Sequence, residues 1–251
     1  MTKRTCDRDL TSVISYAPVS DTHQQRFKSL LDRGLADPRD ERLWEILSED
    51  RGARLLEVLS QRTRFVTVVL EAVHDGHNQA AVLRSADAFG LQDVTIVEAG
   101  ARFAPCSGVS QGAHKWLTLH REPDIASAVG HLRQRGYRVF ASRLDTGAAP
   151  LSELPLDQPV ALVFGNEHLG VSDEASELAD GAFVVPMSGF VQSMNVSVAA
   201  AVAMFETARR ARHAVGECYG LSAGERREVL AGWLRLHLPR GRELPPRSAG
   251  R

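Results

Sequence analysis

From Arg64 onward, short runs of β-branched residues alternate with stretches of helical periodicity. This alternation is typical of βαβ units, whose strands lie parallel in one sheet because a helix carries the chain from each strand to the next. Six runs fit strands: FVTVVL (65–70), VTIV (94–97), WLTLH (116–120), YRVFAS (137–142), VALVF (160–164) and FVV (183–185). The fold class is therefore predicted to be α/β, with a parallel sheet flanked by helices.

Helical patterns fill the intervals of this region and both ends of the chain. Helices within the α/β region should start at Asn78, near Asp124 and at Ser172, and a long one should run from Asn195 to about Ala214. Three further segments have helical periodicity: HQQRFKSLLDRGL (23–35), ERLWEILSEDRGARLLEVLSQR (41–62) and AGERREVLAGWLRLHL (223–238). The second of these should bury one stripe of side chains: Leu43, Ile46, Leu47, Leu55, Leu56 and Leu59.

These patterns divide the chain into three parts. We expect a small helical N-terminal extension over residues 1–61, an α/β domain over 62–216, and a C-terminal helix with an arginine-rich, disordered tail over 217–251.

Composition and spacing exclude several classes of protein. No apolar stretch approaches the roughly 20 residues that cross a bilayer, and the N-terminus does not resemble a secretory signal. We therefore expect a cytoplasmic protein without a membrane partner. The three cysteines form no CxxC pair and the histidines show no metal-ligand spacing, so we expect reduced thiols and no metal.

The glycines are placed unusually for a nucleotide-binding sheet. No GxGxxG or GxxxxGKS follows the first predicted strand, which argues against a dehydrogenase or a phosphate-loop enzyme. Glycines cluster instead in VFGNEHLGVSDE (163–174) and VPMSGFVQSMNVS (185–197), each directly after a predicted strand. Ligands of open α/β sheets bind beyond the carboxyl ends of strands, and glycine lets the backbone approach them closely.

Polar side chains occupy the strand-to-helix junctions around these loops: Asn78, Arg84, Glu167, Ser193 and Asn195. Asn78 and Arg84 are six residues apart, close to two helical turns, so one helix could present both to a ligand. Structural roles remain open at this point. The two asparagines could simply cap helices, Glu167 could bind backbone amides, and Arg84 could pair with Asp87.

Three segments carry a resemblance to a known family: HNQAAVLRSADAFG (77–90), VALVFGNEHLGVSDEA (160–175) and VVPMSGFVQSMNVSVAAAVAMFE (184–206). In order and spacing they resemble the three motifs of the SpoU family of RNA ribose 2′-O-methyltransferases, within the SPOUT superfamily. The resemblance extends from about Leu55 to about Leu238. Within the family the chain is most similar to enzymes that methylate the D-loop guanosine at position 18 of tRNA.

The resemblance implies a deep C-terminal trefoil knot, S-adenosylmethionine as cofactor, no metal, and a homodimer whose active site is shared across the knot interface. By motif position it implies cofactor contacts at Ser142, Gly165, Val185 and Met194, the last standing where the family mostly has Leu. It implies catalytic roles for Asn78, Arg84, Glu167, Ser193 and Asn195. Removing the proton of a free arginine at neutral pH costs about 7 kcal/mol. Our hypothesis for Arg84 is therefore that it grips a substrate phosphate and stabilises the developing alkoxide.

Two alternatives stay open. A ribosomal RNA 2′-O-methyltransferase of the same family often carries a compact α/β RNA-binding domain before the catalytic one, and residues 1–61 look too short and too helical for that. A non-catalytic RNA-binding protein of the same fold should have lost the arginine or the asparagine pair, and both are present. The favoured substrate is therefore tRNA.

Overall fold

The computed structural model describes residues 23–98 and 103–237. These residues divide into two compact units. One covers residues 63–219 within those limits, and the other combines 23–62 with 220–237.

The first unit contains a seven-stranded sheet in which every strand pair is parallel. Its strands are β1 (Val66–Glu71), β2 (Asp93–Val97), β3 (Thr118–Glu122), β4 (Arg138–Ser142), β5 (Ala149–Pro150), β6 (Val160–Phe164) and β7 (Gly181–Val184). The order across the sheet is β3-β2-β1-β6-β4-β7-β5. The parallel sheet is therefore confirmed. The two-residue β5 was not predicted, and β3 begins two residues later than expected because Trp116 ends a short 3-10 helix.

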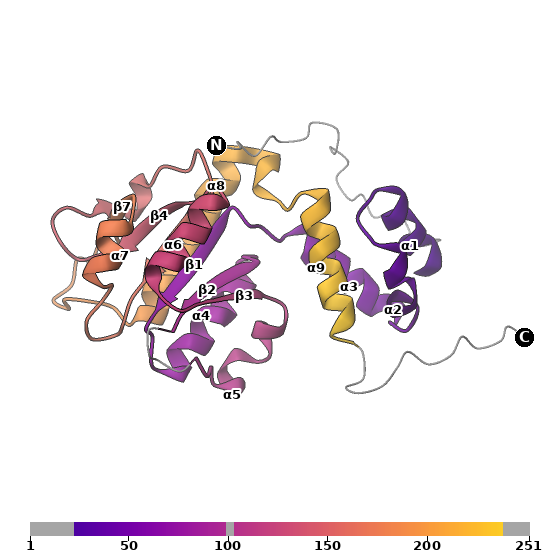
Figure 1. The fold of residues 1–251 in the computed structure, drawn as a ribbon, viewed down its shortest axis with the longest axis horizontal. Helices are drawn as coiled ribbons and strands as arrows, with labels where there is room; N and C mark the ends of the chain where they lie inside the picture. The colour runs from indigo at the N-terminus through magenta and orange to yellow at the C-terminus, as the bar shows by residue number, and fades with distance from the viewer. Residues whose placement is uncertain (1–22, 99–102, 238–251) are drawn as a thin grey trace, which may run out of the picture. The chain divides into compact units, whose positions relative to one another are not determined.

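Helices cover both faces of this sheet (Figure 1). The unit contains α4 (Gly76–Ala88), α5 (Ser107–Ser110), η2 (Ala113–Lys115), α6 (Ile125–Gln134), η3 (Leu151–Glu153), α7 (Asp173–Leu178), α8 (Val196–Val215) and η4 (Gly216–Tyr219). Side chains of α4 and α8 share one core with Val68 and Leu70, whereas α6 and α7 share another with Val69. Successive residues of β1 thus face opposite layers, which explains its unbroken apolar sequence.

Side-chain caps fix where the helices begin. Asp124, Ser172 and Asn195 each accept a hydrogen bond from the first turn of the helix that follows, as expected for α6, α7 and α8. The predicted start of α4 at Asn78 is wrong by two residues. The carboxylate of Asp75 accepts from the backbone N–H of His77, so the helix begins at Gly76.

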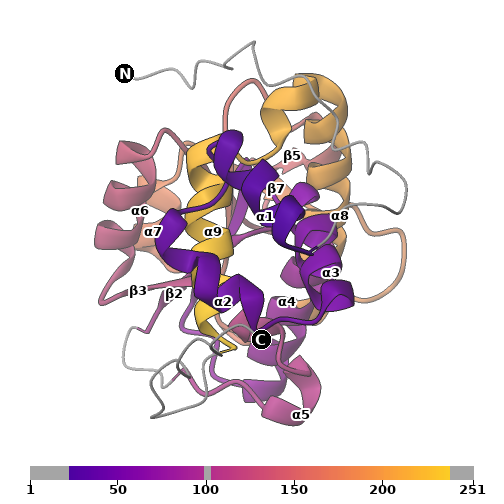
Figure 2. The same ribbon diagram turned by 90° about the vertical axis from the view of Figure 1, so that its right-hand side faces the viewer.

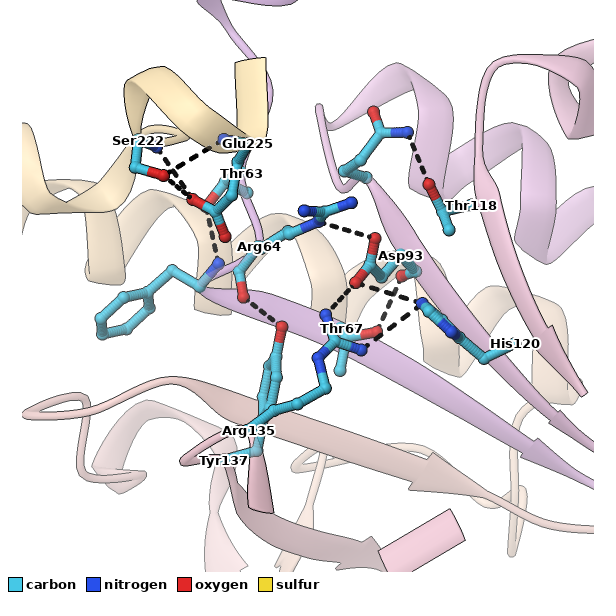
Figure 3. Close-up of polar contacts among 12 residues, drawn as sticks. Thr63, Arg64, Thr67, Asp93, Thr118, His120, Arg135, Tyr137, Ser222 and Glu225 are labelled. Carbon is cyan, nitrogen blue, oxygen red and sulfur yellow. Dashed lines mark hydrogen bonds and ion pairs between the residues drawn. The ribbon is translucent and has the colours of Figure 1, made fainter. Parts of the chain in front are cut away.

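An ionic cluster lies on the side of the sheet where the strands begin, and it surrounds the buried carboxylate of Asp93 (Figure 3). This Asp93 cluster consists of Asp93, Arg64, His120 and Arg135. Arg64 Nε lies 3.1 Å from one carboxylate oxygen of Asp93, while His120 Nε2, at 3.3 Å, and Arg135 bind the other. The backbone carbonyl of Asp93 accepts from Thr67 Oγ1 at 2.7 Å. Burial raises the pKa of Asp93, but His120 and the two arginines outweigh it and lower the pKa to about 2.

The second unit is helical. It contains α1 (His23–Asp32), η1 (Pro38–Asp40), α2 (Glu41–Glu45), α3 (Glu49–Ser60) and α9 (Ala223–Arg235), and α9 lies beside α2 and α3 (Figure 2). Helices from both ends of the chain thus share one unit, although the sequence treats them as separate segments. The segment 41–62 splits because Ser48 caps α3. The residues of the predicted stripe are buried except Ile46, which is 43% exposed. The prediction is wrong for Ile46 because this residue follows the end of α2.

Three remaining expectations concern the rest of the chain. Cys218 is disulfide-bonded, so the prediction that all three thiols are reduced is wrong. The predicted disorder of the tail after residue 238 lies outside the described residues. Within the described ranges, no helix has the length and apolar character needed to span a bilayer.

Candidate functional site

A pocket of about 380 Å³ opens at the carboxyl ends of β4, β6 and β7. Its lining comes from the last residues of β4 and β6 and from the segments that follow the three strands, over 142–145, 164–171 and 185–199, with gaps in the last range. Ser142, Gly165, Val185 and Met194, the four residues predicted to contact a cofactor, all line it. Parallel strands direct their carboxyl ends to one edge of the sheet, and this is why segments so far apart in sequence meet there.

The loop after β6, residues 165–172, is folded tightly and is called the glycine loop below. A Cβ on Gly165 would lie 2.0 Å from the carbonyl oxygen of Gly170, which no side chain could tolerate. Gly170 itself has a φ of +73°, a left-handed conformation that suits glycine. Asn166 Oδ1 accepts from the backbone N–H groups of His168 and Leu169, at 2.9 and 3.2 Å. Where Gly165 meets Gly170, the pocket wall is therefore backbone packed against backbone.

Three of the predicted catalytic residues form a continuous chain of hydrogen bonds, the amide network. Asn78 Nδ2 donates to Glu167 Oε1 at 3.1 Å, and Asn195 Nδ2 donates to Asn78 Oδ1 at 3.0 Å. Glu167 also accepts the backbone N–H groups of Asp75 and His74, at 3.2 and 3.4 Å. The network therefore ties the glycine loop to the start of α4 and the start of α8.

Glu167 is held in its charged form. Burial raises the pKa of its carboxyl group, but the hydrogen bonds from Asn78 and from the backbone N–H groups outweigh burial, so the pKa lies below its usual value. A carboxylate of this kind accepts hydrogen bonds at neutral pH and orients the groups that donate to it. It is poorly suited to give up a proton.

The other two predicted catalytic residues lie differently. Ser193 lines the pocket. Arg84 lies on the exposed face of α4 and is absent from the pocket lining. Within the described part of the chain the side chain of Arg84 forms no hydrogen bond or ion pair, so the pairing with Asp87 considered from the sequence is not present there. The fold of one chain thus brings four of the five residues to the pocket or the amide network. The guanidinium of Arg84 belongs to neither and is exposed.

Sequence reasoning missed some residues of this site. Asn166 stands between two residues that were singled out, yet its hydrogen bonds become visible only in the folded loop. Leu169 is 89% exposed and Leu144 is 61% exposed, although both line the pocket. The signal that could have identified them is a large apolar residue inside an otherwise polar or glycine-rich loop.

Metal ligands do not gather in the described residues, where no group of three or more His, Cys, Asp and Glu side chains could hold an ion.

Comparisons with known proteins agree with this geometry. The model of the SpoU rRNA Methylase family matches residues 65–205. The tRNA (guanosine(18)-2'-O)-methyltransferase of Thermus thermophilus is 42% identical over 189 residues, which is 75% of this chain and 97% of that protein. The enzyme of the same name from Escherichia coli is 35% identical over 168 residues, 67% of this chain and 73% of that protein.

A solved structure, the A. aeolicus TrmH/SpoU tRNA modifying enzyme, shares the fold with a TM-score of 0.68. It is 33% identical and is matched over 75% of this chain and 96% of that one.

Proposed function

The chain belongs to the SpoU rRNA methylase family, and from that premise we propose that it transfers the methyl group of S-adenosylmethionine to a ribose 2′-hydroxyl of tRNA, at guanosine 18 of the D-loop. The observation that carries the proposal is the meeting of the family's motif residues at one pocket, with Gly165, Ser193 and Met194 in its lining. The two relatives compared above are both named for methylation of guanosine 18 in tRNA.

The pocket fits the proposed cofactor. Its volume of about 380 Å³ lies in the range of small-molecule sites. Any Cβ on Gly165 would destroy its close approach to Gly170, so glycine at position 165 keeps the loop tightly folded along the wall where the cofactor would lie. When bound, S-adenosylmethionine supplies an electrophilic methyl group on a sulfonium centre. Ser142, Gly165, Val185 and Met194 would hold it.

The residues of this chain would then orient the acceptor. In-line attack on a methyl group requires the ribose oxygen to be aligned and to lose one proton. Glu167 and Asn195 fix Asn78 by hydrogen bonds, and Ser193 stands in the pocket wall. Arg84 would bind a phosphate of the RNA and stabilise negative charge growing on the 2′-oxygen, a role that the planar guanidinium fork suits.

A homodimer is part of this proposal. Val198, Val202 and Phe205 are exposed on α8 at a spacing that places them on one helical face, while Ala203 and Met204 are buried within the chain. Phe190, in the loop before α8, is also fully exposed. An apolar stripe of this kind is stabilised when a second copy covers it. A second copy would also explain how Arg84, which lies outside the pocket lining of its own chain, can take part in a shared active site.

We also propose the trefoil knot. After β7, next to the edge of the sheet, the chain returns as α8 to contact β1 and α4 near the sheet centre. The chain reaches α8 through residues 185–195, part of which lines the pocket. A trefoil knot requires such a return, because the C-terminal segment must pass through the loop that precedes it. A tRNA substrate would place the activity in the cytoplasm.

The direct test is transfer of labelled methyl from S-adenosylmethionine to unfractionated tRNA and, separately, to ribosomal RNA, followed by nuclease mapping. We expect 2′-O-methylguanosine in the tRNA D-loop. Label in ribosomal RNA alone would overturn the tRNA substrate while keeping the reaction. Label in neither would overturn methyl transfer and favour a non-catalytic RNA-binding protein.

A further inference from the structure

The glycine loop is attached to the end of β1 and the turn that follows it, residues 72–75, at three points. Near its start, Asn166 Nδ2 donates to the carbonyl oxygen of Ala72 at 3.1 Å. At its end, Glu71 accepts the backbone N–H of Ser172 at 2.9 Å and the Ser172 hydroxyl at 2.5 Å. Between them lies the carboxylate of Glu167 with its backbone donors in the turn. The turn leads directly into α4, which carries Asn78 and Arg84.

The backbone at the attachment point is strained. Ala72 has a φ of +51°, a left-handed conformation that an L-residue with a Cβ adopts rarely and at a free-energy cost. Such a conformation persists only where its surroundings hold it, and it is concentrated at functional sites. The groups that hold it are visible. The N–H of Ala72 donates to the carbonyl oxygen of Val97 at 3.1 Å, and its own carbonyl accepts from Asn166.

Asparagine at position 166 uses both ends of its amide. The Oδ1 atom shapes the glycine loop by accepting from two backbone N–H groups of that loop, and the Nδ2 atom reaches across to Ala72. Glu71 is buried and directs both carboxylate oxygens to Ser172. Neither Glu71 nor Ser172 lines the pocket, whereas Asn166 does. These contacts therefore join the pocket wall to a turn that lies outside it.

We propose that Asn166 and Glu71 are positioning residues that couple the pocket to helix α4, so that a ligand in the pocket fixes the turn at residues 72–75 and with it the first turn of α4. The inference rests on the proposed function for the identity of that ligand. Coupling between two sites is reciprocal, so RNA that orders α4 also strengthens binding in the pocket.

The variant that isolates this link is Asn166→Asp. An aspartate keeps an acceptor for the N–H groups of His168 and Leu169, but it has no N–H to donate and it sets a negative charge against the carbonyl oxygen of Ala72. The probe is S-adenosylhomocysteine, titrated by calorimetry into the wild-type chain and the variant. We expect affinity to fall about tenfold, the effect of losing one partly buried hydrogen bond and setting a charge beside a carbonyl oxygen. Gln134→Glu adds the same charge at an exposed position of α6, outside the pocket lining, and should bind as the wild type does.

Hydrogen exchange at saturating S-adenosylhomocysteine separates coupling from binding. In the wild type, the ligand should slow exchange at the N–H of Gly170, inside the pocket, and at those of His74 and Asp75, outside it. In Asn166→Asp, protection at Gly170 should remain while protection at His74 and Asp75 is largely lost. A role in general stability alone would change all three sites together.

The outcomes distinguish the two proposals. If the wild type does not bind S-adenosylhomocysteine, the proposed function fails. If it binds, and Asn166→Asp retains both the affinity and the protection at His74 and Asp75, the coupling is overturned. Should Asn166→Asp not fold, Ser172→Ala removes the hydroxyl bond to Glu71 together with the side-chain cap of α7, and it leaves the backbone bond to Glu71 in place. It should show the same loss of protection to a smaller degree, and full protection would contradict the proposal.

Discussion

The first unit contains two polar clusters at opposite edges of the same sheet, and they are built from different chemistry. The Asp93 cluster, at the amino ends of the strands, surrounds one buried carboxylate with two arginines and a histidine (Figure 3). The amide network, at the carboxyl ends, joins one partly buried carboxylate to two neutral asparagines and backbone N–H groups.

The two clusters differ in whether their charged groups can still bind a further partner. Asp93 is 1% exposed and pairs both oxygens with permanent or potential cations, so this carboxylate is closed to a ligand. The amide network borders a pocket, and the guanidinium of Arg84, on the same helix as Asn78, has no partner among the described residues. The charge pairs of the Asp93 cluster are thus used within the sheet, whereas the amide network shares helix α4 with a charged group that has no partner among the described residues.

The largest effect should come from Arg84→Ala. We expect methyl transfer to fall on the order of 10³-fold, because a group that stabilises developing charge is removed. The midpoint of thermal unfolding should hardly change, because the exposed side chain has no partner to lose among the described residues. Single-turnover transfer and thermal unfolding measure the two quantities. Arg84→Lys tests the need for the fork, and near-normal activity in it would contradict a bidentate role.

The reverse pattern is expected of Asp93→Ala. Removing the carboxylate leaves Arg64 buried beside Arg135 without their shared partner, which should lower the free energy of unfolding by about 3–5 kcal/mol. Urea unfolding measures this change. Activity per folded molecule should stay near that of the wild type, because no member of the cluster lines the pocket. A large loss of activity in the folded variant would break the contrast between the two clusters.

A smaller effect should appear on acidification. The pKa of Asp93 is about 2 in the folded protein against 3.8 as the usual value, so the folded state favours the charged form. The stabilisation is complete above pH 3.8 and is lost as the pH falls from there toward 2. It amounts to about 2 kcal/mol. Asp93→Asn should flatten the pH dependence of unfolding in this window, and an unchanged slope would show that Asp93 is not responsible.

Part of this fold could be predicted from the sequence because a local residue pattern identifies each element of that part. The strand at Val160–Phe164 was predicted to the residue, since it is a continuous apolar run buried on both faces. Asn195 indicates the start of α8 because it is a capping residue directly before an apolar helical pattern. By contrast, β5 has two residues, Ala149 and Pro150, and no pattern, because pairing with β7 alone makes it a strand.

The residues of the site likewise fall into those that a local pattern identifies and those that it does not. Motif residues could be named from their order and spacing, because they follow strands that are themselves easy to recognise. The bond that Asn166 makes to the strained Ala72 and the ion pairs of the Asp93 cluster join residues between 27 and 94 positions apart. Such contacts depend on the path of the chain in space, and no local pattern reports them.

The claim that the pocket beyond β4, β6 and β7 is the active centre is tested most directly by titrating S-adenosylhomocysteine into the wild type, Gly165→Ala and Asp93→Asn by calorimetry. The Cβ at position 165 would meet the Gly170 carbonyl at 2.0 Å and force the glycine loop apart. We expect binding to the wild type, similar affinity in folded Asp93→Asn, and loss of binding in Gly165→Ala. Unchanged affinity in Gly165→Ala would place the ligand elsewhere and contradict the account.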